Sequence, residues 1–255
     1  MSVEATLTGR VALVTGVSRP IGIGATVASR LHAMGATVYA TGWPAHDEEM
    51  PWGRTEIDLP FTVGRHDLED PAGPAALVQD VLAAHGRLDI TVAVHARSSA
   101  QQLPDVTAEE LHRSWNANVQ SVVLLAQQFA KHHEPVPAPE TPTGRMLWFT
   151  SGQHLGPMDD TLTYAITKGA LQQMTASLGR ALAPARIAAN CINPGPVDTG
   201  WADPETHDLV AASFPDKRWG TPDDVANLVA FLVSDDGAWI RGQVLNSEGG
   251  FDRQG

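Results

Sequence analysis

Short apolar runs alternate with longer amphipathic stretches along most of the chain. The apolar runs, typical of strands buried on both faces, occupy residues 10–14, 36–40, 62–63, 90–94, 145–150, 187–192 and 243–246. The amphipathic stretches, with apolar residues at helical spacing, occupy residues 24–34, 75–85, 107–132, 164–181 and 223–232. Parallel strands need such helical crossovers. The alternation therefore predicts one α/β domain over residues 1–255, a doubly wound parallel sheet with helices on both faces.

The longest helical stretch has a recognisable start and end. Thr107 is a helix-capping residue with Glu110 three positions later, as in a capping box. We expect this helix to run, with a bend, through Asn118 towards His132. Residues 133–142 contain four prolines and must form a loop, because proline does not fit a helix interior.

Composition and charge argue against several classes of protein. The net charge of −12 disfavours a sequence-independent nucleic-acid binder and a basic membrane-surface protein. The only cysteine, Cys191, rules out a disulfide framework and a cysteine-rich metal site, and its apolar surroundings suit a small core residue. The first residues lack the basic and apolar regions of a signal peptide, and no apolar run approaches the ~20 residues that span a bilayer. We expect a cytoplasmic protein with no nucleic-acid or membrane partner.

A glycine-rich turn, residues 15–24, lies between the first strand and the first helix. Glycines at this point let the backbone approach a pyrophosphate, and the amides at the following helix N-terminus attract its charge. The position after the first strand favours a dinucleotide site of the Rossmann type. A plain tight turn between strand and helix is the alternative.

Tyr164 and Lys168 stand four residues apart in a helical stretch, so their side chains share one face. A nearby ammonium lowers the pKa of a tyrosine from about 10 towards the range useful for acid–base chemistry. Such a pair alone also occurs by chance in many helices. Ser151, at the end of the preceding strand, offers a hydroxyl to a developing alkoxide, although serine at a strand end is also ordinary turn chemistry.

Together these motifs resemble the short-chain dehydrogenase/reductase family over residues 7–250. The family fingerprint is Thr-Gly, three residues and Gly-x-Gly. Here Thr15-Gly16 precedes Gly22-Ile23-Gly24, with two additional residues in the turn. Ser151 precedes Tyr164 by thirteen residues, the spacing that the family uses.

The resemblance implies a set of catalytic roles. Tyr164 would transfer the proton, Ser151 would bind the substrate oxygen, and Lys168 would lower the pKa of the tyrosine and hold the nicotinamide ribose. Asn118 resembles the family asparagine that holds a water bridging to the lysine. An asparagine inside a helix is locally unfavourable, which suits a functional role; Asn116 is the competing candidate.

The sequence favours NADP(H) over NAD(H). Sites for NAD usually place an acid after the second strand to bind the ribose 2′-hydroxyl, whereas here no acid follows until Asp47. Ser18-Arg19 resembles the Ser-Arg of members that hold a 2′-phosphate, for which a guanidinium is well suited; a solvated loop cation is the alternative for Arg19.

Asp67 resembles the aspartate that binds the adenine amino group. The implied cofactor residues are Gly16, Ser18, Arg19, Gly22, Ile23, Gly24, Thr41, Asp67, Leu68, Val94, His95, Ala96, Tyr164, Lys168, Pro194, Gly195, Val197 and Thr199.

One segment departs from the family. Its Asn-Asn-Ala-Gly after the fourth strand is replaced by Ala93-Val94-His95-Ala96. Backbone contacts to the cofactor can survive this change, but the side-chain roles of the asparagines cannot. His95 either lines the cofactor cleft or is a polar filler at the strand end.

The implied activity is hydride transfer between NADP(H) and a carbonyl or secondary alcohol, such as a 3-oxoacyl group or a related ketone, in a homotetramer. Non-redox lyase chemistry on the same fold is a second hypothesis. Relatives of that kind replace the lysine by arginine and lose the glycine-rich turn, so Lys168 counts against it. A dinucleotide-sensing protein without turnover is the third, and the complete catalytic set disfavours it.

The substrate is less defined by the sequence. An enoyl reductase would want a longer spacing between tyrosine and lysine. We expect the substrate pocket to be shaped by Gln153, His154, Met158 and residues 201–214, a mixture of apolar and polar groups.

Overall fold

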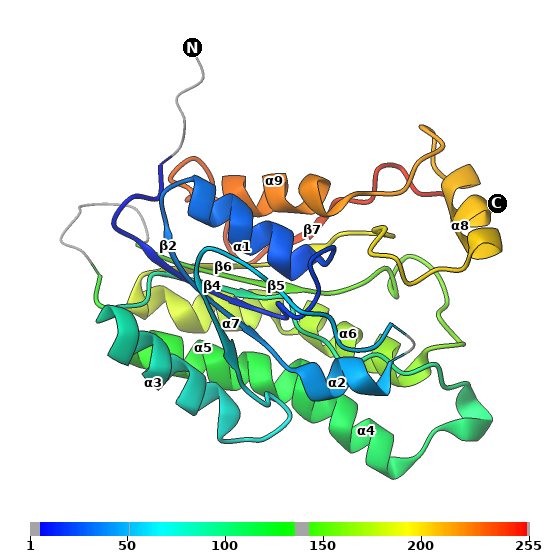
Figure 1. Ribbon diagram of the computed structural model, residues 1–255, viewed down its shortest axis with the longest axis horizontal. Coiled ribbons are helices and arrows are strands. Elements are labelled where there is room, and N and C mark those ends of the chain that lie inside the picture. The colour runs from blue at the N-terminus through cyan, green and yellow to red at the C-terminus, as the bar shows by residue number, and fades with distance from the viewer. Residues whose placement is uncertain (1–5, 51, 136–142, 254–255) are drawn as a thin grey trace.

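The computed structural model describes residues 6–50, 52–135 and 143–253. Seven parallel strands form one sheet in the order β3-β2-β1-β4-β5-β6-β7, drawn in Figure 1. The strands are β1 (Val11–Thr15), β2 (Thr37–Gly42), β3 (Thr62–Arg65), β4 (Ile90–Ala93), β5 (Gly144–Phe149), β6 (Ile187–Asn193) and β7 (Val244–Asn246). The order reverses between β1 and β4, so the chain winds outward in both directions from this point. The expected doubly wound α/β fold is confirmed.

Helices cover both faces of the sheet (Figure 1). One face carries α1 (Ile23–Ala33) and α9 (Pro222–Val233), and the other carries α3 (Gly73–His85) and α5 (Ser121–His132). Each face has its own apolar core. On the first face, side chains of the strands pack against those of α1 and α9. On the second face, side chains of the strands, α3 and α5 form a cluster that includes Trp148. Burial on both sides explains why the strands are apolar runs and not alternating patterns. Cys191 is a buried free thiol, as expected.

The helix predicted from Thr107 through Asn118 towards His132, with a bend, consists of two α-helices joined by a π-helical turn. Thr107 caps α4 (Ala108–Trp115), and its hydroxyl accepts a hydrogen bond from Glu110 N at 3.1 Å. The carboxylate of Glu110 does not complete the capping box; Arg97 binds it at 2.9 and 3.0 Å. Between α4 and α5, residues Asn116–Gln120 form a π-helical turn, a feature that frequently occurs at functional sites.

The prediction of one continuous helix over residues 164–181 is wrong, because the structure has two helices there. It is divided into α6 (Leu162–Gln173) and α7 (Thr175–Leu182) at Met174. The hydroxyl of Thr175 donates to the carbonyl of Leu171 at 2.9 Å. Such back-bonding to the preceding turn bends helices, which accounts for the break.

Two short helices were not predicted. They are α2 (Pro44–Glu49) and α8 (Pro204–Ala212), and both begin with proline, a residue favoured at the first helical position. Neither is long enough to show a clear apolar repeat. Three further turns of 3₁₀ or π type lie at Leu103–Asp105, Ala183–Ala185 and the Asn116 segment.

The remaining expectations concern loops and location. The helix preceding the proline-rich loop ends at His132 as predicted, while residues 136–142 of that loop lie outside the described residues. Within the described ranges, no helix has the length and apolar character to cross a membrane. A cytoplasmic location stays a prediction.

Candidate active site

The glycine-rich turn crosses the carboxyl edge of the sheet between β1 and α1. Gly16 has a φ of +73°, and a Cβ there would lie 2.6 Å from the backbone nitrogen of His95. A Cβ on Gly24 would lie 2.4 Å from the carbonyl oxygen of Gly16. Both positions therefore require glycine. Gly22 precedes α1, where no side chain caps the helix and no acid occupies the first turn, so the positive end of the helix dipole is left for an anion.

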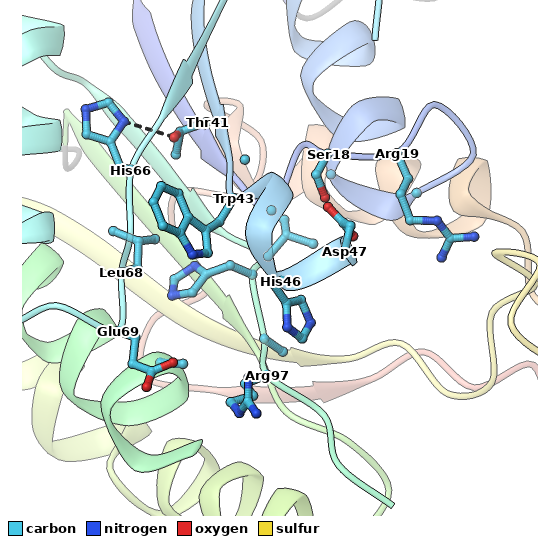
Figure 2. Close-up of a pocket in the computed structure, with 18 of the residues that line it drawn as sticks. Ser18, Arg19, Thr41, Trp43, His46, Asp47, His66, Leu68, Glu69 and Arg97 are labelled. Carbon is cyan, nitrogen blue, oxygen red and sulfur yellow. Dashed lines mark hydrogen bonds between the residues drawn. The ribbon is translucent and has the colours of Figure 1, made fainter. Parts of the chain in front are cut away.

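A cavity of about 310 Å³ opens in front of this turn; Figure 2 shows most of its lining side chains. It lies at the carboxyl ends of β1, β2 and β4, where doubly wound sheets bind their ligands. Most of the expected cofactor residues line it: Gly16, Ser18, Arg19, Gly22, Ile23, Gly24, Thr41, Asp67, Leu68, Val94, His95, Ala96 and Thr199. Pro194 and Val197 border a neighbouring cavity of about 220 Å³ instead. The glycine cradle, the uncapped helix and the volume together fit a dinucleotide phosphate group.

Sequence reasoning missed part of the cavity wall. The helix α2 brings Trp43, His46, Asp47 and Glu49 to the cavity. Asp47 is buried, and its Oδ1 accepts a hydrogen bond from Trp52 Nε1 at 3.0 Å. The first acid after β2 therefore does face the cavity, although four residues lie between it and the strand. The only sequence signal was the proline that starts α2.

Ion pairs hold α2 against two arginines on the other side of the cavity. Glu49 accepts hydrogen bonds from Arg97 at 3.0 Å and from Arg113 of α4 at 3.3 Å. Arg113 also binds Glu69, after β3, at 2.8 Å. These contacts favour the charged forms, which lowers the pKa of Glu49 and raises that of Arg113.

Arg19 lies at the edge of the cavity and bridges two loops. Its Nη2 donates to the carbonyl oxygen of Thr199 at 2.7 Å, and its guanidinium lies 4.6 Å from the ring centre of Trp52. Arg19 is thus a partnered residue and not the solvated loop cation of the alternative interpretation. In this structure its guanidinium is directed at the segment after β6.

His95 joins the glycine-rich turn to the π-helical turn. The hydroxyl of Thr15 accepts hydrogen bonds from the backbone nitrogens of Val94 and His95, at 3.2 and 3.4 Å, so its own hydrogen is free for His95 Nδ1 at 2.5 Å. The hydroxyl of Ser121 donates to the carbonyl of Ala117 at 2.5 Å and can therefore accept from His95 Nε2 at 2.8 Å. This assignment places the proton of a neutral ring on Nε2. Burial, and secondarily the charge of Lys168, lower the pKa of His95 to about 3.

Asn118 is fully buried in the π-helical turn. Its Oδ1 accepts a hydrogen bond from Arg97 N at 2.6 Å, while its Nδ2 donates to Arg97 O at 2.9 Å and to Thr167 Oγ1 at 2.9 Å. The side chain thus holds the loop after β4 against α6, which carries Tyr164. Asn118 is buried in this turn and Asn116 is not; the expected water bridge from Asn118 to Lys168 stays a prediction.

Tyr164, Lys168 and Ser151 meet beside the carboxyl end of β5. The ammonium of Lys168 lies 5.3 Å from the centre of the Tyr164 ring and donates to the carbonyl of Phe149 at 2.8 Å. Ser151 is close enough to lower the pKa of the Tyr164 phenol, and its hydroxyl donates to Met158 Sδ at 3.9 Å. The structure therefore brings the three residues together as the sequence predicts.

Burial dominates the electrostatics of this group. It raises the pKa of Tyr164 to about 12, and the nearby Ser151 hydroxyl opposes the rise only in part. It lowers the pKa of Lys168 to about 8. The protein alone thus keeps Tyr164 protonated at neutral pH, and the phenolate needs a further positive charge nearby.

The comparisons with known proteins agree with this arrangement. A family model described as enoyl-(acyl carrier protein) reductase matches residues 16–252. The chain is 34% identical over 247 residues to the uncharacterized oxidoreductase YjdA of Bacillus subtilis, covering 96% of this chain and 97% of the relative. It is 32% identical over 263 residues to the short-chain dehydrogenase/reductase FrzI of Cladobotryum sp, covering 98% of each.

The chain belongs to the short-chain dehydrogenase/reductase family. A crystal structure of a short-chain dehydrogenase from Burkholderia cenocepacia, in complex with NADP, has a TM-score of 0.80 and 33% identity to it, covering 96% of this chain and 98% of that one. The protein is therefore an oxidoreductase of this family, and not the lyase or the sensor of the alternative hypotheses. Its four-residue spacing from Tyr164 to Lys168 remains shorter than the spacing we expect of an enoyl reductase.

Proposed function

We propose that this oxidoreductase transfers a hydride between NADP(H) and a carbonyl or secondary alcohol, with Tyr164 as the acid/base. The convergence of Asn118, Ser151, Tyr164 and Lys168, together with the cavity in front of the glycine-rich turn, carries the proposal. A 3-oxoacyl group or a related ketone is the substrate class, supported by the matching family model, which is described by an acyl-carrier-protein reaction.

Each residue has a distinct task in this proposal. Ser151 donates its hydroxyl hydrogen to the substrate oxygen, and Tyr164 gives a proton to that oxygen as a carbonyl is reduced. Lys168 orients the nicotinamide ribose and, with its ammonium, favours the phenolate left behind. Asn118 holds the loop and the helix that meet at this point. The bound dinucleotide supplies the hydride and, when oxidised, the positive ring charge that offsets the burial of Tyr164.

The proposed cofactor site combines three parts of the structure. Gly16, Gly22 and Gly24 would surround the pyrophosphate, Asp67 and Leu68 would bind the adenine, and the segment Pro194–Thr199 would hold the nicotinamide carboxamide. NADP(H) is favoured because Ser18 and Arg19 stand at the cavity edge and because the Burkholderia relative was crystallised with NADP. Asp47 faces the same cavity and works against a 2′-phosphate placed next to its carboxylate.

We also propose a homotetramer. Apolar side chains remain exposed on three consecutive helices of one region: Leu111 and Trp115 on α4, Val123 on α5 and Ile166 on α6. Exposed apolar groups that gather in this way commonly mark a protein interface. These helices also carry or adjoin Asn118 and Tyr164, so assembly would stiffen the catalytic end.

The decisive experiment compares Tyr164→Phe with Lys168→Ala. Phenylalanine preserves packing but has no proton to give, so Tyr164→Phe should lose at least about a hundredfold in kcat and keep dinucleotide affinity. Lys168→Ala should weaken dinucleotide binding as well as slow turnover, and its residual activity should require higher pH. Both are measured by NADPH oxidation with a panel of ketones and by NADPH titration. Retention of more than about a tenth of kcat in Tyr164→Phe would show that another group is the acid/base.

A further inference from the structure

The last described segment of the chain is joined to the catalytic end by a largely shielded ion pair. Arg253 Nη1 donates to Glu248 Oε2 at 2.9 Å, and Arg253 Nη2 bonds the other carboxylate oxygen. Only 18% of the arginine side chain and 10% of the glutamate side chain are exposed. Charges are rarely buried unless they are paired in this way, and neither residue belongs to the proposed catalytic set.

Glu248 is attached to the segment after β6. Its Oε1 accepts a hydrogen bond from Asn193 Nδ2 at 2.9 Å, and Asn193 Oδ1 accepts one from Gly195 N at 3.2 Å. Gly195 has a φ of +65°, and a Cβ there would lie 2.9 Å from Glu248 Cα. The proposed nicotinamide-binding segment therefore packs directly on Glu248, with no space between their backbones.

Arg253 is attached to the turn after β5. A Cβ on Gly152 would have three atoms of the Arg253 guanidinium group as its nearest neighbours, the closest being Nη2 at 1.8 Å. A Cβ on Gly156 would lie 3.0 Å from Arg253 Cδ. The guanidinium thus lies against the backbone of Gly152, the residue that follows Ser151.

The sheet does not hold these two segments together by itself. Strands β5 and β6 are paired as far as Phe149 with Ile192, and one further backbone bond joins Thr150 N to Ile192 O at 2.9 Å. Ser151 and Pro194 lie beyond this register. Hydride transfer needs the reacting atoms about 3–3.5 Å apart, and a misplacement of 1 Å can cost roughly a hundredfold in rate.

We propose that Glu248 and Arg253 are positioning residues, whose ion pair holds the nicotinamide-binding segment against the Ser151–Gly152 turn. The inference rests on the proposed function, which assigns the nicotinamide to one segment and the substrate oxygen to the other. Neither residue lines the cavity in front of the glycine-rich turn. It sets the distance over which the hydride moves and the angle at which Ser151 meets the substrate oxygen.

Gly152 supplies a reciprocal test. Gly152→Ala would push the guanidinium away while leaving both charges in the protein, and Arg253→Ala would remove the guanidinium itself. Because all three nearest neighbours of the added methyl belong to Arg253, Gly152→Ala should do little further harm once Arg253 is alanine. Gly169→Ala is the matched control, since a Cβ at Gly169 meets nothing within 4 Å.

The measurements are kcat and KM for NADPH and ketone, the primary isotope effect with nicotinamide-deuterated NADPH, and the melting temperature. We expect kcat to fall roughly tenfold to a hundredfold in each single variant, with KM for NADPH near the wild-type value and a larger isotope effect. The double variant should be no slower than the slower single variant. A purely structural anchor would lower the melting temperature and leave the isotope effect unchanged.

Three results would overturn the proposal: an unchanged kcat in Arg253→Ala, rate losses that multiply in the double variant, or an unchanged isotope effect. If Arg253→Ala does not fold, Gly152→Ala alone still decides, because it retains the ion-pairing groups. Wild-type protein that reduces no ketone refutes the proposed function and this inference together. Active wild-type protein with unaffected variants refutes the positioning pair alone.

Discussion

Replacing His95 by glutamine tests the hydrogen-bond chain across the floor of the cofactor cavity. The imidazole contacts Thr15 Oγ1 with one nitrogen and Ser121 Oγ with the other, at 2.5 and 2.8 Å. The two polar atoms of a glutamine amide cannot point in opposite directions as the two ring nitrogens do. Glutamine therefore retains at most one of these two hydrogen bonds. Losing the bond to Thr15 leaves the hydroxyl hydrogen of this buried residue without an acceptor, which costs about 1–3 kcal/mol in the free energy of unfolding at pH 7.

The pH dependence follows from the lowered pKa of His95. In the unfolded chain this histidine takes up a proton near pH 6.5, whereas in the folded protein its pKa is about 3. Between these values protonation favours unfolding, so wild-type stability falls as the pH falls, by up to about 1.4 kcal/mol per pH unit. The contribution is fully present above pH 6.5 and is about 2 kcal/mol smaller at pH 5. Glutamine does not titrate, so the penalty of His95→Gln should shrink and nearly vanish at pH 5.

Urea unfolding at pH 7, 6 and 5 and fixed protein concentration measures this difference. His112→Gln, a substitution of an exposed histidine on α4, is the control and should show a small effect at every pH. Carboxylates titrate equally in all three proteins and cancel in the comparison. A penalty for His95→Gln that stays constant from pH 7 to pH 5 would refute the buried, neutral ring. An equally stable His95→Gln protein at pH 7 would refute the hydrogen-bond chain.

Two further predictions concern the cofactor and the assembly. NADPH should bind more tightly than NADH in a fluorescence titration, because Ser18 and Arg19 stand at the cavity edge; equal or reversed affinities would assign the ribose end to Asp47 instead. Light scattering at micromolar concentration should give a mass about four times the 27.1 kDa of one chain, and Trp115→Glu should lower it because a charge would replace an exposed apolar side chain. A wild-type mass near that of one chain would contradict the tetramer.

The parts of the fold that sequence predicts are those governed by regular apolar spacing. Strands β1, β4, β5 and β6 are mainly apolar because both faces of the sheet are covered. The short helix α2 has no such repeat, and its position is set by ion pairs from Glu49 to Arg97 and Arg113. Those partners are 48 and 64 residues away, and contacts of that range leave no local pattern.

The residues of the candidate site also fall into two groups, those in local sequence motifs and those placed by long-range contacts. Tyr164, Lys168 and the glycines lie in compact motifs whose spacing reflects one helix face and one turn, so the sequence reveals them. Asp47 lies beyond the end of β2 in the sequence, and only the turn of α2 brings its side chain to the cavity. The Glu248–Arg253 pair has no sequence signal, since it depends on the last segment returning to Gly152.

The altered segment after β4 shows which constraints the cofactor site imposes. Gly16 still lies so close to the backbone of His95 that a Cβ would not fit between them. The hydroxyl of Thr15 still accepts hydrogen bonds from the amides of Val94 and His95. These contacts use backbone atoms, so they survive the replacement of the family's asparagines. What changes is the side chain beneath, where an imidazole now reaches from Thr15 to Ser121. Because that ring stays neutral at physiological pH, it adds a cross-link between the glycine-rich turn and the Asn118 turn without placing a charge beneath the dinucleotide.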